Sequence, residues 1–445
     1  MTSRIRVVIT LILVLSIQSV WAQAPARFTL KEAQDYGVAN NVQVKSAQLD
    51  VRSAETTVDE RLSTGLPQLN ASIDYQNFFK LPTSLLPAEF FGGEAGEFIP
   101  VQFGTEQNVT AGLSASQLLF NGAWFVALNA SKIYVNMVEA QQTVAESDVK
   151  KNVETAYYSV LIAKEFEGLL QKNIENLDKV YFEVSEMNKQ GFVEEIDVDR
   201  LKISKSTLNG QLENAKRQTE LAKSYLKFSM GMDMNSEIEL TDTLGGMLNG
   251  NFNVIDNDQN FLTRPEFQIM QTLVTLNEYN VKVNKSAYLP TLALYASFSE
   301  NAQRNQFDFF DNEGDWFQTG LVGVKMDIPI FSGFYRKSTL QNAQIGLEHA
   351  QLNQQNATQG ILMEIENARI TYLNAENDLA TQQENIDLAQ KIYNTTLIKY
   401  KAGVGSSIEL TSAESTLYQT QGSYIAALFN LLTAKTNLTK SLGYY

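Results

Sequence analysis

The sequence predicts an α+β membrane protein built from two structural repeats, each with long helices and a pair of strands. Three observations carry this prediction. An apolar stripe with helical spacing recurs after 212 residues, two very long stretches contain no proline, and four segments alternate apolar and polar residues. Because the repeat covers helices and strands alike, the chain divides into two similar halves joined by a short segment.

The helical stripe lies between residues 149 and 184. Its apolar members are spaced by three or four residues, apart from one step of seven, as on one face of a helix. They are Val149, Val153, Ala156, Val160, Ala163, Leu170, Ile174, Leu177, Tyr181 and Val184. Most of the stripe recurs 212 residues later, and the same offset relates Gly191 to Gly403 and Gly231 to Gly443. One structural unit is therefore used twice.

The proline-free stretches set the size of the helices. They run from 126 to 181 and from 338 to 400. At the usual rise per residue, such helices are about 80–95 Å long, which exceeds the diameter of an ordinary compact domain. A soluble coiled coil is the alternative interpretation of this feature taken alone.

Four segments show the two-residue period of strands. We expect strands near 67–79, 108–120, 290–299 and 319–331. In the first, Leu69, Ala71, Ile73 and Tyr75 alternate with polar residues. Strands of about ten residues have the length of outer-membrane strands, although two soluble hairpins would show the same alternation.

The remaining elements follow the same order in each half. A helix is predicted from Thr29, as N-cap with Glu32 three residues on, to about Ser63. Its counterpart spans about 265–287, and long loops are expected at 80–106 and 299–319. Repeat 1 therefore occupies 23–231, repeat 2 occupies 264–445, and an irregular acidic segment, 232–263, links them.

Four strands cannot close on themselves, and lipid does not tolerate open sheet edges. The smallest usual barrel has about eight strands, so at least two chains are needed, and three would give twelve. Polar positions of the strands would then face a water-filled lumen. Aromatic residues near strand ends fit two interfacial girdles. These are Phe78, Phe79, Trp124, Phe125, Phe298, Trp316, Phe317 and Phe331.

Composition excludes most catalytic chemistry. The chain has no cysteine and a single histidine, His349, which we expect on the surface of a helix. Metal sites of the usual kind and Ser-His or Cys-His catalysis are therefore not predicted, and no cofactor is expected. The Gly-x-Gly at 403–405 follows no strand, so it is not interpreted as a nucleotide site. A net charge of −15 argues against nucleic-acid binding.

The N-terminus predicts a secretory signal peptide over residues 1–22. Arg4 and Arg6 precede an apolar run, 7–17, which is too short to span a bilayer as a helix. Cleavage after Ala22 would leave Gln23 first. No later run of 18 apolar residues exists, so any membrane span must consist of strands.

The chain resembles the TolC-like family of outer-membrane efflux proteins over nearly its whole mature length. The resemblance rests on the repeat itself and on three pairs of motifs. Strands open with Leu66-Pro67 and Leu289-Pro290, and they end with Leu119-Phe120-Asn121-Gly122 and Ile330-Phe331-Ser332-Gly333. The helix turns contain Gly191…Ile196-Asp197-Val198 and Gly403…Ile408-Glu409-Leu410. No single motif is specific, whereas their order and duplication are.

The resemblance implies a homotrimer in the outer membrane of a Gram-negative bacterium. Three chains would form a twelve-stranded β-barrel continuous with a long periplasmic α-helical barrel. Such a trimer serves as the exit duct of a tripartite efflux pump or of a type I secretion system. Its partners would be a periplasmic adaptor and a proton-driven or ABC transporter of the inner membrane. Trimer rather than dimer rests on the resemblance alone.

The resemblance also points to the two helix–helix turns, 189–198 and 401–410, as the periplasmic tip. In the family, acidic residues there line the narrowest point, and the matching positions are Asp197 and Glu409. Three copies would form a carboxylate ring that favours cations, although N-capping or helix-dipole complementation is the alternative role. One turn later the family often has a second acid, where this chain has Arg200 and Ser412.

The glycines of these turns are expected to cap helix C-termini in the left-handed conformation. The resemblance makes the same turns the docking site for the adaptor, and the candidates are Gly191, Phe192, Gly403, Val404 and Gly405. Export of small molecules such as drugs is the favoured function, and protein secretion is the second. A secreted adhesive coiled-coil protein is the alternative from another class.

Overall fold

A computed structural model describes residues 26–248, 258–311 and 314–445 of the chain. The predicted signal peptide, 1–22, lies outside these residues. The chain divides into two compact units. Of the described residues, the helical unit contains 26–49, 141–248, 258–267 and 357–445, and the strand unit contains 50–140, 268–311 and 314–356.

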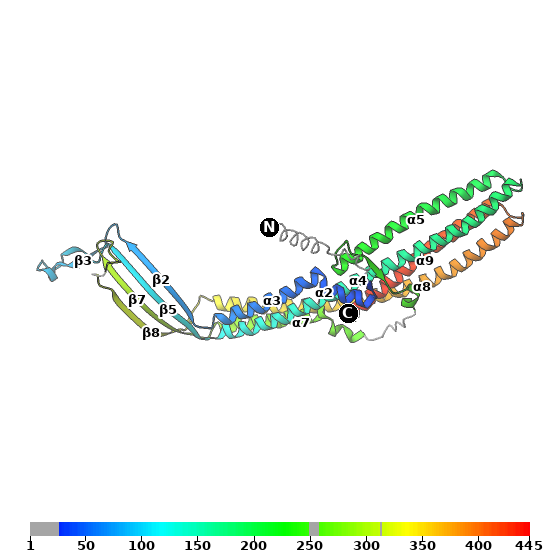
Figure 1. The fold of residues 1–445 in the computed structure, drawn as a ribbon. Coiled ribbons are helices and arrows are strands. Elements are labelled where there is room, and N and C mark those ends of the chain that lie inside the picture. The colour runs from blue at the N-terminus through cyan, green and yellow to red at the C-terminus, as the bar shows by residue number, and fades with distance from the viewer. Residues whose placement is uncertain (1–25, 249–257, 312–313) are drawn as a thin grey trace, which may run out of the picture. The chain divides into compact units, whose positions relative to one another are not determined.

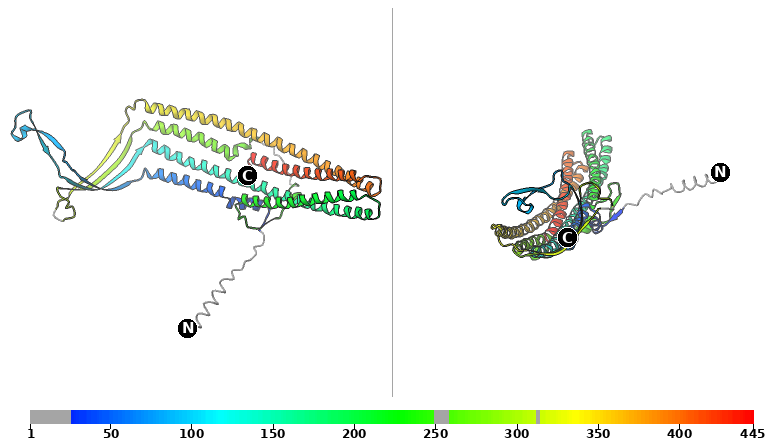
Figure 2. Two further views of the ribbon diagram at one scale, coloured as in Figure 1. Left: turned by 90° about the horizontal axis from the view of Figure 1, so that it is seen from above. Right: turned by 90° about the vertical axis from the view of Figure 1, so that its left-hand side faces the viewer.

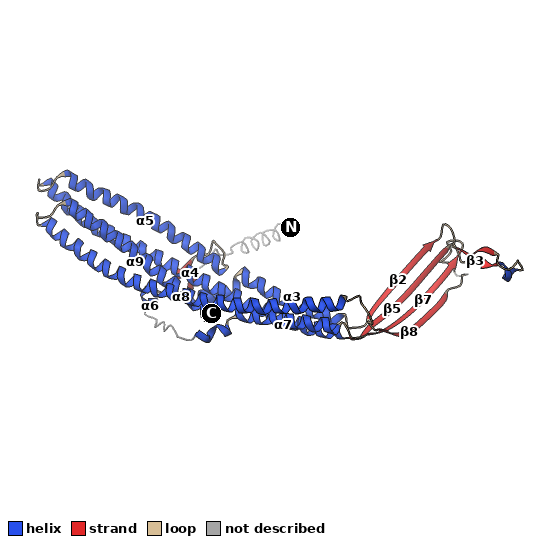
Figure 3. Cartoon of the chain, turned by 180° about the vertical axis from the view of Figure 1, so that it is seen from behind, coloured by secondary structure: helices blue, strands red, loops and turns tan. Residues whose placement is uncertain are grey.

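The helices and strands follow one another in two similar orders, coloured by type in Figure 3. The helices before residue 231 are α2 (Leu30–Asn40), α3 (Val42–Ser63), α4 (Gly122–Lys189) and α5 (Glu195–Met230). Those after residue 264 are α7 (Pro265–Ser286), α8 (Tyr335–Lys401) and α9 (Ser407–Ser441). The long helices have 68 residues in α4 and 67 in α8, and both begin earlier and end later than the sequence indicates.

The first helix differs from its prediction. The capping box of Thr29 and Glu32 is confirmed, because each side chain binds the other residue's backbone N–H. However, the helix expected to run to Ser63 is interrupted at Asn41, which has extended backbone angles. The Asn41 side-chain amide donates to the Ser229 carbonyl oxygen (2.8 Å), and its Oδ1 accepts from the Gln43 backbone (2.8 Å). These side-chain hydrogen bonds replace helical ones and start α3 as a new helix.

The strand unit contains a four-stranded antiparallel sheet, whose strands lie side by side in Figure 1. Its order is β2–β5–β7–β8. The strands are β2 (Gln68–Asn77), β5 (Gln107–Asn121), β7 (Thr291–Arg304) and β8 (Phe317–Asp327). All four predicted strands are present, but β7 continues past 299 and β8 ends four residues before Phe331. Pro329 follows β8 closely and cannot donate a backbone hydrogen bond to a ladder.

The long segment 80–106, predicted as a loop, also contains a small hairpin. It consists of β3 (Thr83–Pro87) and β4 (Phe98–Gln102), joined through a short 3₁₀ helix, η1 (Ala88–Phe91). Ser84-Leu85-Leu86 and Phe98-Ile99 supply residues that fit a strand, and the prolines stand at β3 and β4 positions of an isolated two-stranded sheet. The glycine and proline content hid this hairpin from the sequence prediction.

The segment 232–263 packs within the helical unit where it is described. Strand β6 (Ile238–Leu240) pairs in parallel with β1 (Ala26–Phe28). The short helices α6 (Leu244–Leu248) and η2 (Asp258–Thr263) follow. Residues 249–257 lie outside the described part of the chain. The linking segment therefore has secondary structure of its own at both ends.

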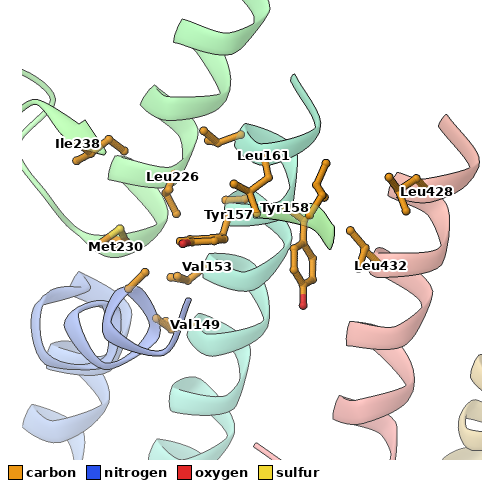
Figure 4. Packing of buried hydrophobic residues seen from close by; sticks show 14 of the residues in the cluster. Val149, Val153, Tyr157, Tyr158, Leu161, Leu226, Met230, Ile238, Leu428 and Leu432 are labelled. Atoms are coloured by element: carbon orange, nitrogen blue, oxygen red, sulfur yellow. The ribbon is translucent and has the colours of Figure 1, made fainter. Parts of the chain in front are cut away.

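The core lies in the helical unit, where three clusters of apolar residues are buried. Figure 2 shows the two helix hairpins, α4/α5 and α8/α9, that supply most of them. In the cluster drawn in Figure 4, the predicted stripe residues Val149 and Val153 lie beside Tyr157, whose side chain is fully buried. The Tyr157 hydroxyl donates to Asp242 Oδ2 (2.9 Å), so its polar end is satisfied inside the core.

One further prediction can be checked here. His349 is exposed on α8, as expected. Across the described residues, the helices include none with a stretch long and apolar enough to cross a membrane.

Candidate functional site: the sheet faces and the helix-hairpin tips

The four-stranded sheet has one polar and one apolar face. Directly paired residues of neighbouring strands lie on the same face. One row pairs Asn70, Ser114, Ser297 and Leu321, and the next pairs Ser72, Gly112, Ser299 and Thr319. Rows on the other face are Leu69, Ala115, Ala296 and Val322, and Ala71, Leu113, Phe298 and Gly320. The alternation seen in the sequence is therefore in register across all four strands.

The polar face carries charge at both ends of the strands. Asp74 is in the same row as Thr110 and Asn301, and the Thr110 hydroxyl donates to Asn301 Oδ1 (2.7 Å). At the other end, Lys325 Nζ lies 3.2 Å from Asp327 Oδ2. On the apolar face, large side chains at both sheet edges are exposed, including Ile73 (80%) and Val322 (77%). Such a sheet suits a boundary between water and an apolar medium.

The predicted interfacial aromatics fall into three groups. Phe78 and Phe79 directly follow β2, Trp316 precedes β8, and Phe331 lies just beyond β8. Trp124 begins α4 after β5, and its Nε1 donates to the Arg61 carbonyl oxygen (2.8 Å). Phe298 does not lie near a strand end, because β7 continues to Arg304. It sits within the apolar face, beside Leu113.

The two hairpin turns have the same backbone structure. Gly191 and Gly403 have φ angles of 78° and 76°, in the left-handed region. In the first turn, the Gly191 N–H bonds to the Asn188 oxygen and the Phe192 N–H to the Met187 oxygen. In the second, the bonds run from Gly403 to Tyr400 and from Val404 to Lys399. Both turns are Schellman caps, so the predicted capping role of the glycines is confirmed.

The two tip acids differ in their surroundings. Asp197 lies in the first turn of α5, with its side chain 18% exposed and its Oδ1 3.9 Å from Arg200 Nη1. Arg200 Nη1 also donates to the Ser407 hydroxyl (2.6 Å), so it joins the start of α5 to the start of α9. Asp197 therefore has a basic neighbour as well as a favourable position at a helix N-terminus.

Glu409 is exposed in the first turn of α9. Its backbone N–H bonds to the Ser406 hydroxyl (3.2 Å), so Ser406, and not the acid, is the N-cap. Among the described residues no ion pair with the Glu409 carboxylate is found. Ser412 is exposed on the same helix, one turn further on. Of the two acids predicted to form the carboxylate ring, Glu409 is therefore the one whose charge is not offset by a basic neighbour among the described residues.

The adaptor-docking candidates form exposed apolar points on both turns. Phe192 is 72% exposed and Val404 is 78% exposed. Ile196 and Ile408, at the starts of α5 and α9, are also exposed. Gly405 is less open, because an added Cβ would come within 3.0 Å of the Tyr400 backbone. Exposed apolar patches of this kind are typical of interaction sites.

One acidic residue was missed in the sequence. Glu414 on α9 is buried, with a side chain only 2% exposed. Its position gives a signal that could have identified it, because it lies at helical spacing between the buried Leu410 and Leu417. Within the described ranges, no cluster of three or more histidine, cysteine or acidic side chains could hold a metal.

Strands of about ten residues with one apolar and one polar face are features of proteins that enter the outer membrane as a β-barrel. Residues 259–444 match the family described as outer membrane efflux protein. The probable efflux pump outer membrane protein TtgC of Pseudomonas putida is 21% identical over 76% of this chain and 69% of its own length. The outer membrane efflux protein BepC of Brucella suis is 21% identical over 95% of this chain and 86% of its own.

The fold is also that of a solved protein. The crystal structure of CusC superimposes with a TM-score of 0.75 and 17% identity, covering 96% of this chain and 95% of CusC. The family model thus covers the second repeat region of the chain, and over most of its length the chain is similar to outer membrane efflux proteins of the TolC-like kind.

Proposed function

We propose that three copies of this chain form a twelve-stranded barrel in the outer membrane, continuous with a periplasmic barrel of helices. The observation that carries this proposal is the open sheet. Within the described part of the chain, β2 and β8 each pair with only one strand, so each leaves an edge unpaired. Unpaired edges and an exposed apolar face are both costly unless other copies and lipid cover them.

The polar face of the sheet then lines the lumen. Serine, threonine and asparagine side chains dominate this face, and they interact with water without selecting strongly among solutes. The duct conducts passively, and the energy for transport comes from its partners. Native mass spectrometry of the detergent-extracted protein tests the assembly. We expect the mass of three chains, whereas a folded, water-soluble monomer without affinity for detergent contradicts the proposal.

The duct serves as the exit of a tripartite efflux pump for small molecules. This assignment draws on the relatives' names, which describe efflux pump components. A periplasmic adaptor docks on the tip turns, where Phe192 and Val404 supply apolar contacts, and an inner-membrane transporter loads the duct. No enzymatic step is proposed. Type I protein secretion is the second candidate, and an ABC transporter as the cognate partner, instead of a proton-driven one, favours it.

The tip turns close the resting duct, and Glu409 supplies most of the charge at the constriction. Three Glu409 carboxylates around one axis attract cations, whereas the charge of Asp197 is offset by Arg200. In planar bilayers, Glu409→Ala should therefore lower cation selectivity more than Asp197→Ala. The control is Ser412→Ala, which changes no charge. Unchanged selectivity in the double variant Asp197→Ala/Glu409→Ala would refute the ring.

A further inference from the structure

A cavity of about 640 Å³, open to the surface on one side, lies in the helical unit between the α4/α5 hairpin and α9. Helix α4 contributes Phe166, α5 contributes Ser204 and Leu208, and α9 contributes Glu414 and Tyr418. Its volume is within the range of cavities that hold small organic ligands. Neither the sheet faces nor the tip turns include it.

Glu414 is the only acidic residue of the cavity wall. Its Oε1 accepts a hydrogen bond from the Tyr418 hydroxyl (2.9 Å). Its Oε2 is buried and accepts no hydrogen bond of regular geometry from the described residues, although the Ser204 hydroxyl also interacts with this carboxyl. A buried carboxylate oxygen without a partner is costly, so this atom is a natural position for a donor supplied by a ligand.

Among the described residues, no basic side chain lines the wall around this carboxyl. The wall residues from α4 and α5 are uncharged, and the other titratable wall residue on α9 is Tyr418. From α8, Tyr393 faces Glu414, and burial together with the charge of Glu414 raises the Tyr393 pKa to about 12. One turn nearer the tip, Arg200 is held by Asp197 and Ser407. Burial raises the pKa of Glu414 itself, while hydrogen bonds from Tyr418 and Ser204 act in the opposite direction.

The surroundings of Glu414 select the kind of ligand. An anion would be repelled by the carboxylate. A bare metal ion would need several further oxygen ligands, and no cluster of acidic or histidine side chains is present among the described residues. The cavity is also far larger than the roughly 30 Å³ that one water molecule occupies. Aromatic, aliphatic and amide side chains in one wall fit an organic molecule with a positive charge.

We propose that this cavity binds an organic ammonium ion, with the protonated nitrogen at Glu414 Oε2 and the apolar body against Phe166 and Leu208. Bound there, the ligand touches α4, α5 and α9 together and so joins the two hairpins. This inference is independent of the exported substrate and of any partner, because the site lies within one chain.

The test is isothermal titration calorimetry, in which phenethylammonium is added to the purified full-length protein in detergent at pH 8 and at pH 5. The neutral analogue 2-phenylethanol has the same ring without the charge. We expect phenethylammonium to bind more tightly at pH 8, because Glu414 is more fully ionised there while the amine stays protonated at both values. Glu414→Gln should weaken binding about tenfold or more and remove the pH dependence.

The control is Glu175→Gln, which neutralises an exposed acid on α4 outside the cavity wall and should leave the affinity for phenethylammonium unchanged at both pH values. If Glu414→Gln does not fold, Ala163→Leu provides a second route. It keeps the carboxyl but fills part of the cavity, so binding should be lost. Absence of binding to the unmodified protein, undiminished binding to Glu414→Gln, or equal affinity for 2-phenylethanol would each overturn the proposal.

Discussion

The helical unit and the strand unit solve the problem of burying apolar surface in different ways. In the helical unit, the chain covers its own core, and Leu177, Leu226 and Leu438 are fully buried. In the strand unit, all ten residues of β2 are exposed, and most of β8 is exposed as well. A single chain therefore buries an apolar core in the helical unit, whereas the apolar face of its sheet stays exposed and would be covered only in the proposed assembly.

The two units also differ in whether their polar side chains are buried or exposed. Among its described residues, the helical unit buries three charged residues, Glu154, Arg264 and Glu414, and satisfies the first two with hydrogen bonds and ion pairs. Glu154 accepts hydrogen bonds from Gln34, Tyr158, Thr436 and Tyr445, at distances from 2.6 to 3.0 Å. These donors come from α2, α4, α9 and the C-terminus, so one carboxylate joins four segments. In the sheet, polar side chains are exposed and depend on water, as a lumen would provide.

The largest effect is expected from Arg264, a buried cation of the helical unit. Only 3% exposed, it pairs with Glu266 (3.2 Å) and Glu364 (3.1 Å). Its Nη1 also donates to the Ser441 carbonyl oxygen (3.0 Å). Arg264→Ala leaves these partners uncompensated and should destabilise the helical unit by about 3–5 kcal/mol, as measured by denaturant unfolding followed by circular dichroism.

The control for Arg264 is Arg27→Ala in the same unit. Arg27 pairs with Glu239 at 2.9 Å, but both side chains are largely exposed. We therefore expect a loss of no more than about 1 kcal/mol. If the two variants had the same free energy of unfolding, the burial of Arg264 would not contribute to stability. The contrast between the buried core of the helical unit and the exposed sheet would then be weaker.

The second prediction concerns the two faces of β8. Val322 belongs to the apolar face and Leu321 to the polar face. Val322→Lys should cost about 2–4 kcal/mol per chain near the bilayer midplane, whereas Leu321→Lys should be tolerated in a lumen. The amount of trimer in outer-membrane fractions measures the difference. Equal assembly of the two neighbouring lysine variants would show that lipid does not contact the Val322 face.

Much of the fold could be predicted because its signals are local and repeated. The 212-residue offset, the capping box at Thr29 and the alternation in the strands each depend on residues close together in sequence. The break at Asn41 could not be predicted, because it depends on a hydrogen bond to Ser229, distant along the chain. The β3–β4 hairpin was missed for a different reason, since its prolines and glycines resemble those of an irregular loop.

The features of the candidate site can also be separated into those that local sequence predicts and those that depend on tertiary contacts. The left-handed glycine caps follow from local sequence, and the structure confirms them. The charge of Asp197, in contrast, depends on Arg200, whose link to Ser407 joins two hairpins that are far apart in sequence. The cavity around Glu414 likewise arises only when α4, α5 and α9 come together. Tertiary contacts, and not sequence motifs, therefore determine which acidic side chains are paired or buried and which are exposed.

The smallest expected effect comes from the glycines of the tip turns. Gly403 has a left-handed φ of 76°, and an added Cβ would meet no neighbouring atom, so the cost of Gly403→Ala is purely one of backbone conformation. We expect a loss of about 1–2 kcal/mol. Gly360, within α8, also has open space around its Cα but no left-handed φ, so Gly360→Ala should instead stabilise the helix by about 0.5–1 kcal/mol. If thermal unfolding shows that Gly403→Ala lowers the stability and Gly360→Ala raises it, the left-handed backbone of the turn is what requires glycine. If Gly403→Ala leaves the stability unchanged, the tip adopts another backbone conformation.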